Sequence, residues 1–258
     1  MPDSIKRAGE LVLYLAVLVA LWWAVVKAFH VSPLVIPSPE GVWLAGSQNF
    51  RLLASSTAIT LGEALAGFGT AIVAGIIIAI GIVSSRAASR FILPTLVAVN
   101  SAPKVVFAPV LVIWLGLGLW SKVGMAFLLC FFPIVINAAQ GMREVDPELL
   151  DLYRLMQAGR WTTLRRVRLP NSVPYILSGL KIALPLAIIG AVIGEFVAAR
   201  QGIGYQVMLA YSNSNTELVF AAVLTITVAA VVVFQLLVWA ESLILVFYPV
   251  SVEARSTA

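Results

Sequence analysis

Long apolar stretches bounded by charged residues dominate this sequence of 258 residues. A helix needs about 20 apolar residues to cross a bilayer core of about 30 Å. Stretches of that length cover residues 11–29, 58–83, 91–115, 123–140, 173–199 and 218–247. Their apolar residues run continuously instead of alternating, which favours helices over a barrel. The sequence therefore predicts an all-α polytopic membrane protein with six transmembrane helices in a single transmembrane domain over residues 1–258.

The composition excludes several other classes of protein. Hydrophobic residues make up 61% of the chain and charged residues 11%, whereas a soluble globular domain has about 25% charged residues. Cys130 is the single cysteine and His30 the single histidine, which argues against a disulfide scaffold and a histidine-based metal site. The sequence has no phosphate-binding G-x-x-x-x-G-K-[ST] loop and no H-E-x-x-H or G-x-S-x-G motif. We therefore expect no catalytic residues, no metal and no cofactor bound by this chain.

The distribution of lysine and arginine predicts that both termini are cytoplasmic. If the N-terminus is inside, eleven of the 17 basic residues lie in cytoplasmic segments, the side on which positive charge concentrates. Four basic residues then lie in outer segments: Lys27, Arg51, Lys122 and Arg200. Because topology accounts for the net charge of +5, we expect a lipid bilayer as the chain's surroundings and no nucleic-acid partner.

One cytoplasmic segment, residues 143–170, is unusually rich in charge. It holds ten of the chain's 29 charged residues. Asp146 and Pro147 are typical of a helix start, and Gly159 is a plausible stop. We predict one helix over residues 147–158 and a second over residues 161–168 that ends before Leu169 and Pro170.

The first of these helices has an apolar face. Leu149, Leu152, Tyr153 and Met156 follow the i, i+3, i+4, i+7 spacing that places side chains on one side of a helix. Such a hairpin could lie on the membrane surface with its arginines against anionic headgroups. It could instead dock into a groove on a soluble partner.

Ionisable residues within the apolar stretches are candidates for function, because charge is expensive in lipid. Lys104 follows Asn100, Ser101 and Pro103, a polar, helix-bending sequence that could line a cavity. Lys181 lies close enough to the cytoplasmic end of its stretch for its side chain to reach the interface. Glu195 could end a helix near the outer face or lie on a polar path.

Two further features have simpler interpretations. We place Glu63 near the outer interface. We read Gly67 and Gly69 as a helix-packing site, since small residues allow helices to approach closely.

Several motifs together resemble the permease subunits of binding-protein-dependent type I ABC importers, in the nitrate, sulfonate, taurine and thiamine-precursor branch. The family's cytoplasmic motif is E-A-A, three residues, Gly, nine residues, Ile or Val, one residue and Leu-Pro. Residues 167–170 match its end, and counting back places Asp151 to Tyr153 at E-A-A and Gln157 at the glycine, with Gly159 displaced by two residues. The other similar segments are residues 35–39, 101–118, 160–161, 178–180, 194–195 and 202–205.

The resemblance implies a permease of the bacterial cytoplasmic (inner) membrane that pairs with a second copy of itself. A cytoplasmic ABC ATPase dimer would hold ATP and Mg, and an extracytoplasmic substrate-binding protein would dock outside. The residues implied in ATPase coupling are Asp151, Leu152, Tyr153, Arg154, Met156, Gln157, Gly159 and Arg160. The translocation pathway would draw on Asn100, Ser101, Lys104 and Glu195. This chain would transmit motion and would not itself be an enzyme.

Two alternatives and the substrate remain open at this point. The charges within spans would also suit an ATPase-independent secondary transporter or channel. A membrane enzyme has no supporting constellation of residues. A lysine at position 104 would suit a small anion such as a sulfonate or nitrate, so we expect a small anion or polar metabolite as substrate.

Overall fold

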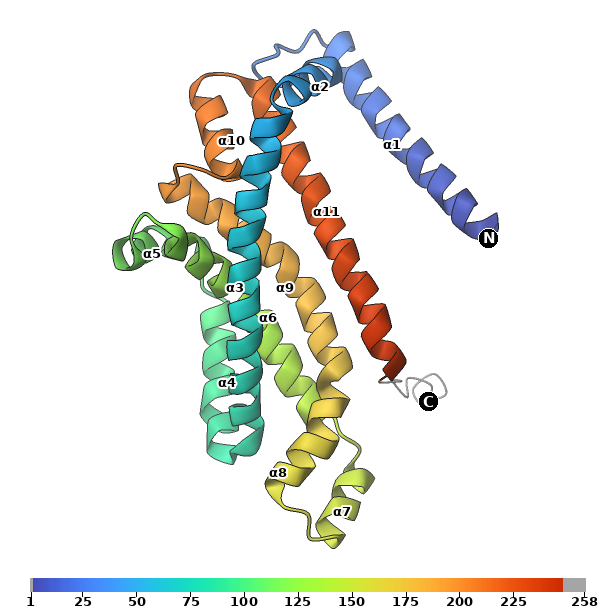
Figure 1. Ribbon diagram of the computed structural model, residues 1–258, viewed down its shortest axis with the longest axis vertical. Coiled ribbons are helices and arrows are strands. Elements are labelled where there is room, and N and C mark those ends of the chain that lie inside the picture. The colour runs from blue at the N-terminus through green and yellow to red at the C-terminus, as the bar shows by residue number, and fades with distance from the viewer. Residues whose placement is uncertain (1, 248–258) are drawn as a thin grey trace. The chain divides into compact units, whose positions relative to one another are not determined.

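A computed structural model describes residues 2–247, apart from the side chains of residues 2–8, 11, 12, 15, 86, 87, 93 and 97. Arg255 and the rest of residues 248–258 lie outside the described residues. Every regular element in the described part is helical (Figure 1): α1 Pro2–Ala28, α2 Pro39–Gln48, α3 Phe50–Ser84, α4 Arg86–Asn100, η1 Lys104–Phe107, α5 Ala108–Leu115, α6 Leu119–Arg143, α7 Pro147–Leu155, α8 Arg160–Thr163, η2 Leu164–Arg168, α9 Leu169–Ala198, α10 Ile203–Ser212 and α11 Thr216–Phe247.

The chain forms two units, and α3 and α11 contribute to both. The first unit comprises residues 1–59 and 201–228. Within it, the indole nitrogen of Trp23 donates to Glu40 at 2.7 Å, which lowers the pKa of that exposed carboxyl by stabilising its charged form. Ser38 caps α2 by accepting from the Gly41 amide at 3.1 Å. The two short helices of this unit, α2 and α10, were not predicted from the sequence.

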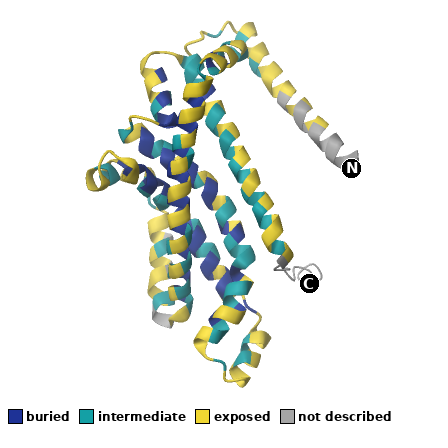
Figure 2. Cartoon of the chain, viewed as in Figure 1, coloured by how far each residue is buried: buried dark blue, intermediate teal, exposed yellow. Residues whose placement is uncertain are grey.

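The second unit comprises residues 60–200 and the described residues from 229 to 247, and its centre is the pair α6 and α9. Buried residues line these two helices (Figure 2). Gly190 and Gly194 form a G-x-x-x-G step on α9. A Cβ at Gly190 would lie 2.7 Å from Ala126 Cα, and one at Gly194 would lie 3.0 Å from Lys122 Cα. The backbones of α6 and α9 therefore approach as closely as small residues allow.

Helix α3 packs against α6 at the same level. A Cβ on Gly67 would meet Ala126 Cβ at 2.6 Å and the Val123 carbonyl oxygen at 2.7 Å, whereas a Cβ on Gly69 would have no neighbour within 4 Å. The packing interpretation is thus confirmed for Gly67 but not for Gly69 in this chain. Ala126 is enclosed between glycines of α3 and α9.

Four helices of the described chain are long and apolar enough to cross a membrane. They are α3, α6, the continuous helix Arg160–Ala198 and Thr216–Val246 of α11. A fifth candidate is a broken span, in which Ala88–Asn100 and Lys104–Leu115 meet at 89°. The apolar part of α1, Ala16–Ala28, is shorter. The expected helical membrane fold is therefore present, and the count of six spans and the cytoplasmic termini remain predictions.

The break in the third predicted span falls where the polar sequence lies. Residues 101–103 separate α4 from η1. Pro109 does not interrupt a helix, since it occupies the first turn of α5, where a missing amide hydrogen costs nothing. Pro103 and its polar neighbours are therefore the breaking element.

Candidate coupling surface and buried charge cluster

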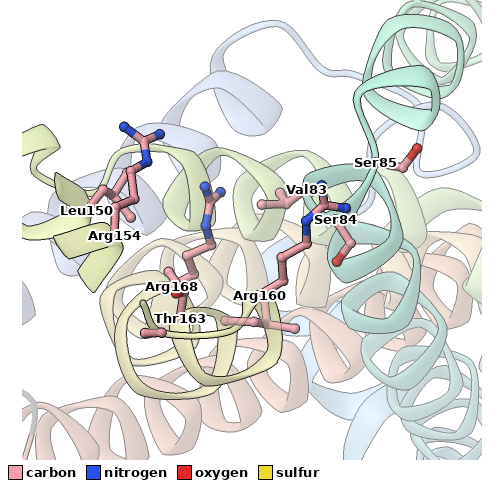
Figure 3. Close-up of a pocket in the computed structure, with 10 residues that line it drawn as sticks. Val83, Ser84, Ser85, Leu150, Arg154, Arg160, Thr163 and Arg168 are labelled. Atoms are coloured by element: carbon pink, nitrogen blue, oxygen red, sulfur yellow. The ribbon is translucent and has the colours of Figure 1, made fainter. Parts of the chain in front are cut away.

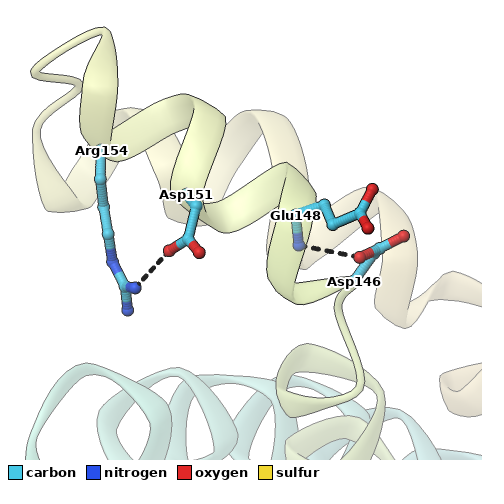
Figure 4. A network of polar contacts seen from close by, with 4 residues as sticks. All are labelled: Asp146, Glu148, Asp151 and Arg154. Carbon is cyan, nitrogen blue, oxygen red and sulfur yellow. Dashed lines mark hydrogen bonds and ion pairs between the residues drawn. The ribbon is translucent and has the colours of Figure 1, made fainter.

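Helix α7 begins at Asp146 and Pro147, as predicted from the sequence. The Asp146 carboxylate accepts from the Glu148 amide at 2.9 Å, and Pro147 follows as the first helical residue. One turn further on, Arg154 pairs with Asp151 at 2.6 Å (Figure 4). This pair is exposed, so it orients the two side chains and contributes little stability.

The apolar face of α7 has no cover in the described chain. Leu152 is 51% exposed, Leu155 83% and Met156 68%, while Tyr153 is half-buried. Leu155 was not among the residues predicted for this face, because it lies six residues after Leu149 and the spacing counted from Leu149 includes only i+3, i+4 and i+7. Exposed large apolar side chains this close together are typical of an interaction surface.

The end of α7 differs from the prediction. The helix ends at Leu155 instead of Ala158, and Gln157, not Gly159, takes the left-handed conformation with φ of 52°. The Ala158 amide then donates to the Tyr153 carbonyl at 3.0 Å. Gly159 is extended and precedes α8. Gln157 thus adopts the conformation that favours glycine, at the position where the family motif has one.

The second helix of the hairpin does not stop before Leu169 and Pro170, so that prediction was wrong. Arg160 begins a helix that continues through α8, the π-helical η2 and α9 to Ala198. In η2 the Leu169 amide donates to the Leu164 carbonyl, one residue further back than in an α-helix. A wider π turn just before Pro170 accommodates the residue that has no amide hydrogen.

A charged cluster is buried between α3, α6 and α9. Its ionisable members are Lys122, Glu63 and Glu195, exposed by 4%, 3% and 2%. The Lys122 ammonium donates to the carbonyl oxygens of Leu117 at 2.5 Å, Gly118 at 2.9 Å and Ala198 at 2.6 Å. All three of its protons are thereby used, which satisfies a charge removed from water.

The two carboxylates of the cluster lie beside this ammonium. Thr60 donates to Glu195 at 2.6 Å, and Glu63 interacts electrostatically with both Glu195 and Lys122. Glu63 Oε2 is buried with no hydrogen-bond partner. The predicted positions of Glu63 near the outer interface and of Lys122 in an outer segment stay predictions, and the structure adds that both side chains are buried between helices. Because α9 packs closely against α6 at Gly194, the adjacent residue Glu195 lies near Lys122.

The residues predicted for the pathway fall into two groups. Lys104 donates to the Asn100 carbonyl at 2.9 Å and to its side-chain oxygen at 2.8 Å, and it lies 5.0 Å from the centre of the Phe132 ring. Ser101 is exposed beside them at the break. Glu195 belongs to the buried cluster instead. Asn100, Ser101 and Lys104 thus form one polar site, and Glu195 has a different set of neighbours.

Lys181 has an ion-pair partner within its own unit. Its ammonium lies 2.7 Å from Glu241 of α11, and the Glu241 side chain is 13% exposed. From the sequence we expected the Lys181 side chain to extend to the membrane interface. The ion pair with Glu241 was not predicted, because nothing in the local sequence indicates that α9 lies beside α11. Paired charges between helices are the usual arrangement for charge at membrane depth.

A helical membrane chain with a charged hairpin between two packed spans is the architecture of a transport permease. The chain belongs to the family described as binding-protein-dependent transport system inner membrane component, whose profile matches residues 71–245. It is therefore the permease component of an ABC importer, a class whose members are not themselves enzymes. This confirms the family, fold class and inner-membrane location expected from the sequence.

Individual relatives and a solved structure agree with this assignment. The chain is 30% identical over 245 residues to the formylaminopyrimidine transport permease protein ThiX of Halalkalibacterium halodurans, covering 93% of this chain and 96% of that protein. It is 30% identical over 223 residues to the taurine transport system permease protein TauC of Escherichia coli K12, covering 84% and 81%. Its fold is similar to a chain of the inward-facing MetNI methionine ABC transporter, with a TM-score of 0.66, 18% identity and coverage of 79% and 99%.

Proposed function

We propose that this permease works as a homodimer that imports a small anion or polar metabolite, driven by a cytoplasmic ABC ATPase dimer that binds ATP and Mg. An extracytoplasmic binding protein delivers the substrate. The observation that supports coupling to the ATPase is the uncovered apolar face of α7, formed by Leu152, Leu155 and Met156. α7 inserts into a groove of the ATPase, and closure of the ATPase dimer moves the spans between inward-facing and outward-facing states.

The position of α7 supports this proposal. It connects α6 to the continuous helix Arg160–Ala198, so a force on α7 acts on both packed spans. Asp151, Arg154 and Arg160 surround the face with charge that orients the partner. Tyr153 contributes less direct contact than we expected from the sequence, because it is half-buried, and Leu155 takes its place.

Co-purification with the ATPase encoded beside this permease tests the coupling step. The double variant Leu152→Asp/Met156→Asp places two charges in the apolar face. Burying a Leu or Met side chain is worth about 1.5–3 kcal/mol, so we expect at least a hundredfold weaker ATPase binding. The matched control, Leu152→Met/Met156→Leu, keeps the face apolar and should retain the ATPase. Retention of the ATPase by the Asp variant, with the permease folded and dimeric, would refute docking through this face.

The substrate class rests on a separate observation, the polar site at the broken span. The Lys104 ammonium lies beside Asn100, where it can attract an anionic group. Relatives named for taurine and for formylaminopyrimidine transport support a small polar molecule as the substrate. We expect Lys104→Met to reduce transport of a sulfonate by about tenfold or more, from the loss of one charged contact, while Lys104→Arg retains it. Equal transport by both variants would remove the charge-based argument.

A further inference from the structure

A cavity opens beside the hairpin formed by α7, α8 and η2, residues 147–168, which we call the coupling hairpin, and the lining of this cavity is rich in arginine. It has a volume of about 860 Å³ and lies between the end of α3, α7 and the start of the continuous helix. Arg154, Arg160 and Arg168 line it, and Figure 3 shows their side chains among the residues of the pocket. A smaller cavity of about 190 Å³ shares Arg168 and adds Arg143. Four arginines therefore gather in the two adjoining cavities, which we call the arginine pocket.

The positive charge of the arginine pocket is only partly balanced. Arg154 pairs with Asp151 at 2.6 Å. Arg168 donates to the Met142 carbonyl at 3.2 Å, and Arg143 donates to the Ser89 hydroxyl, both uncharged oxygens. The charges of Arg154 and Arg143 also repel that of Arg168. Bringing like charges together in this way is unfavourable unless an anion binds among them.

The remaining walls of the pocket identify the kind of anion. Val83, Leu150 and Leu164 contribute apolar surface beside the guanidinium groups. Val83 lies next to the last residue of the α3 span, and Leu164 lies near the start of the helix that runs to Ala198. The pocket is thus at the level of lipid headgroups, where a ligand has both a phosphate and an apolar part. Guanidinium groups bind phosphate oxygens in a bidentate manner.

We propose that the arginine pocket binds the phosphates of an anionic phospholipid, with a diphosphate headgroup such as that of cardiolipin as the best match to its arginines. The lipid connects the end of α3 to the coupling hairpin through Arg160 and Arg168. This inference rests on the proposed function in one respect: the lipid comes from the cytoplasmic leaflet, because the proposed function places the hairpin on the cytoplasmic side. A headgroup in this position would make the hairpin's attachment to the spans depend on the surrounding lipid.

Native mass spectrometry of the purified permease, titrated with cardiolipin in the absence of any ATPase, tests the proposal. The variant is Arg160→Gln/Arg168→Gln. The matched control is Arg165→Gln/Arg166→Gln, which removes two exposed arginines of the same segment that do not line the pocket. We expect about thirtyfold weaker cardiolipin binding for the first pair, from the loss of two basic contacts to an anionic headgroup, and a change of less than about threefold for the control. Phosphatidylethanolamine should bind weakly to all three proteins.

Each other outcome overturns the proposal. Equal weakening in both pairs would mean that diffuse surface charge attracts lipid. Competition by inorganic phosphate at the affinity of cardiolipin would make this a site for a soluble anion. If lipid binding is unchanged and a separate co-purification shows that the Arg160→Gln/Arg168→Gln variant has lost the ATPase, the pocket belongs to an acidic surface of that partner. If the Arg168 change prevents folding, Arg160→Gln against Arg165→Gln gives the same comparison, with about a fivefold difference expected.

Because no ATPase is present, failure of the proposed ATPase coupling cannot produce failure of this test.

Discussion

Two glycines of α3, two residues apart, should respond in opposite directions to the same substitution. In Gly67→Ala the new methyl group would lie 2.6 Å from Ala126 Cβ, 2.7 Å from the Val123 carbonyl oxygen and 2.9 Å from the Phe127 amide nitrogen. Two of these neighbours are backbone atoms, which cannot turn away as a flexible side chain can. Overpacking of this kind costs about 1–3 kcal/mol. Gly69→Ala meets nothing within 4 Å, and replacing a glycine inside a helix gains about 0.5–1 kcal/mol.

Thermal unfolding of the purified permease in detergent measures the difference between these variants. At about 2–4 °C per kcal/mol for a chain of this size, Gly67→Ala should lower the unfolding temperature by roughly 2–12 °C. Gly69→Ala should leave it unchanged or raise it by roughly 1–4 °C. Equal shifts in the two variants would refute the close approach of α3 to α6 at Ala126.

Three further predictions concern buried charge and the end of α7. Lys122→Met should destabilise the protein by about 3–5 kcal/mol, because it leaves buried carboxylates without their cation. Adding Glu195→Gln should recover part of that loss. Strictly additive changes in the unfolding temperature would contradict an energetic coupling between Lys122 and Glu195. Lys181→Met should cost about 1–3 kcal/mol by leaving Glu241 without its partner, and the double variant with Glu241→Gln should unfold closer to the wild type. Gln157→Gly should raise stability by about 1 kcal/mol or less, since glycine adopts a φ of 52° without strain; a lower unfolding temperature would argue against that conformation.

Local signals predicted the framework of the molecule well. Apolar length identified α3, α6, α9 and α11 as spans, since a bilayer requires it of any crossing helix. Asp146 and Pro147 correctly marked the start of α7, because capping depends on adjacent residues alone. The end of α7 was predicted wrongly, because the prediction relied on the nearby glycine, Gly159. Glycine is the usual left-handed residue, and nothing local indicates that Gln157 takes that role.

The buried cluster could not be predicted, because its members are far apart in the sequence. Lys122 stands just before an apolar stretch and resembles a loop charge that marks topology. Its burial follows from the glycine step of α9, which brings Ala198 and Glu195 to the start of α6. Glu63 becomes part of the cluster through the contact of Gly67 with α6. Hydropathy alone reports length and polarity and contains no information on which helix faces meet.

The helix that starts in the coupling hairpin is also the helix that ends at the buried cluster. Arg160 to Ala198 is a single element of 39 residues, about 58 Å long at 1.5 Å per residue. Such an element behaves as a lever arm. A tilt of 5° about its hairpin end would displace Glu195, about 52 Å away, by roughly 4–5 Å. That distance exceeds the length of any hydrogen bond at Lys122, so a small rotation imposed at the hairpin end of this helix is enough to open or close the polar contacts at its other end.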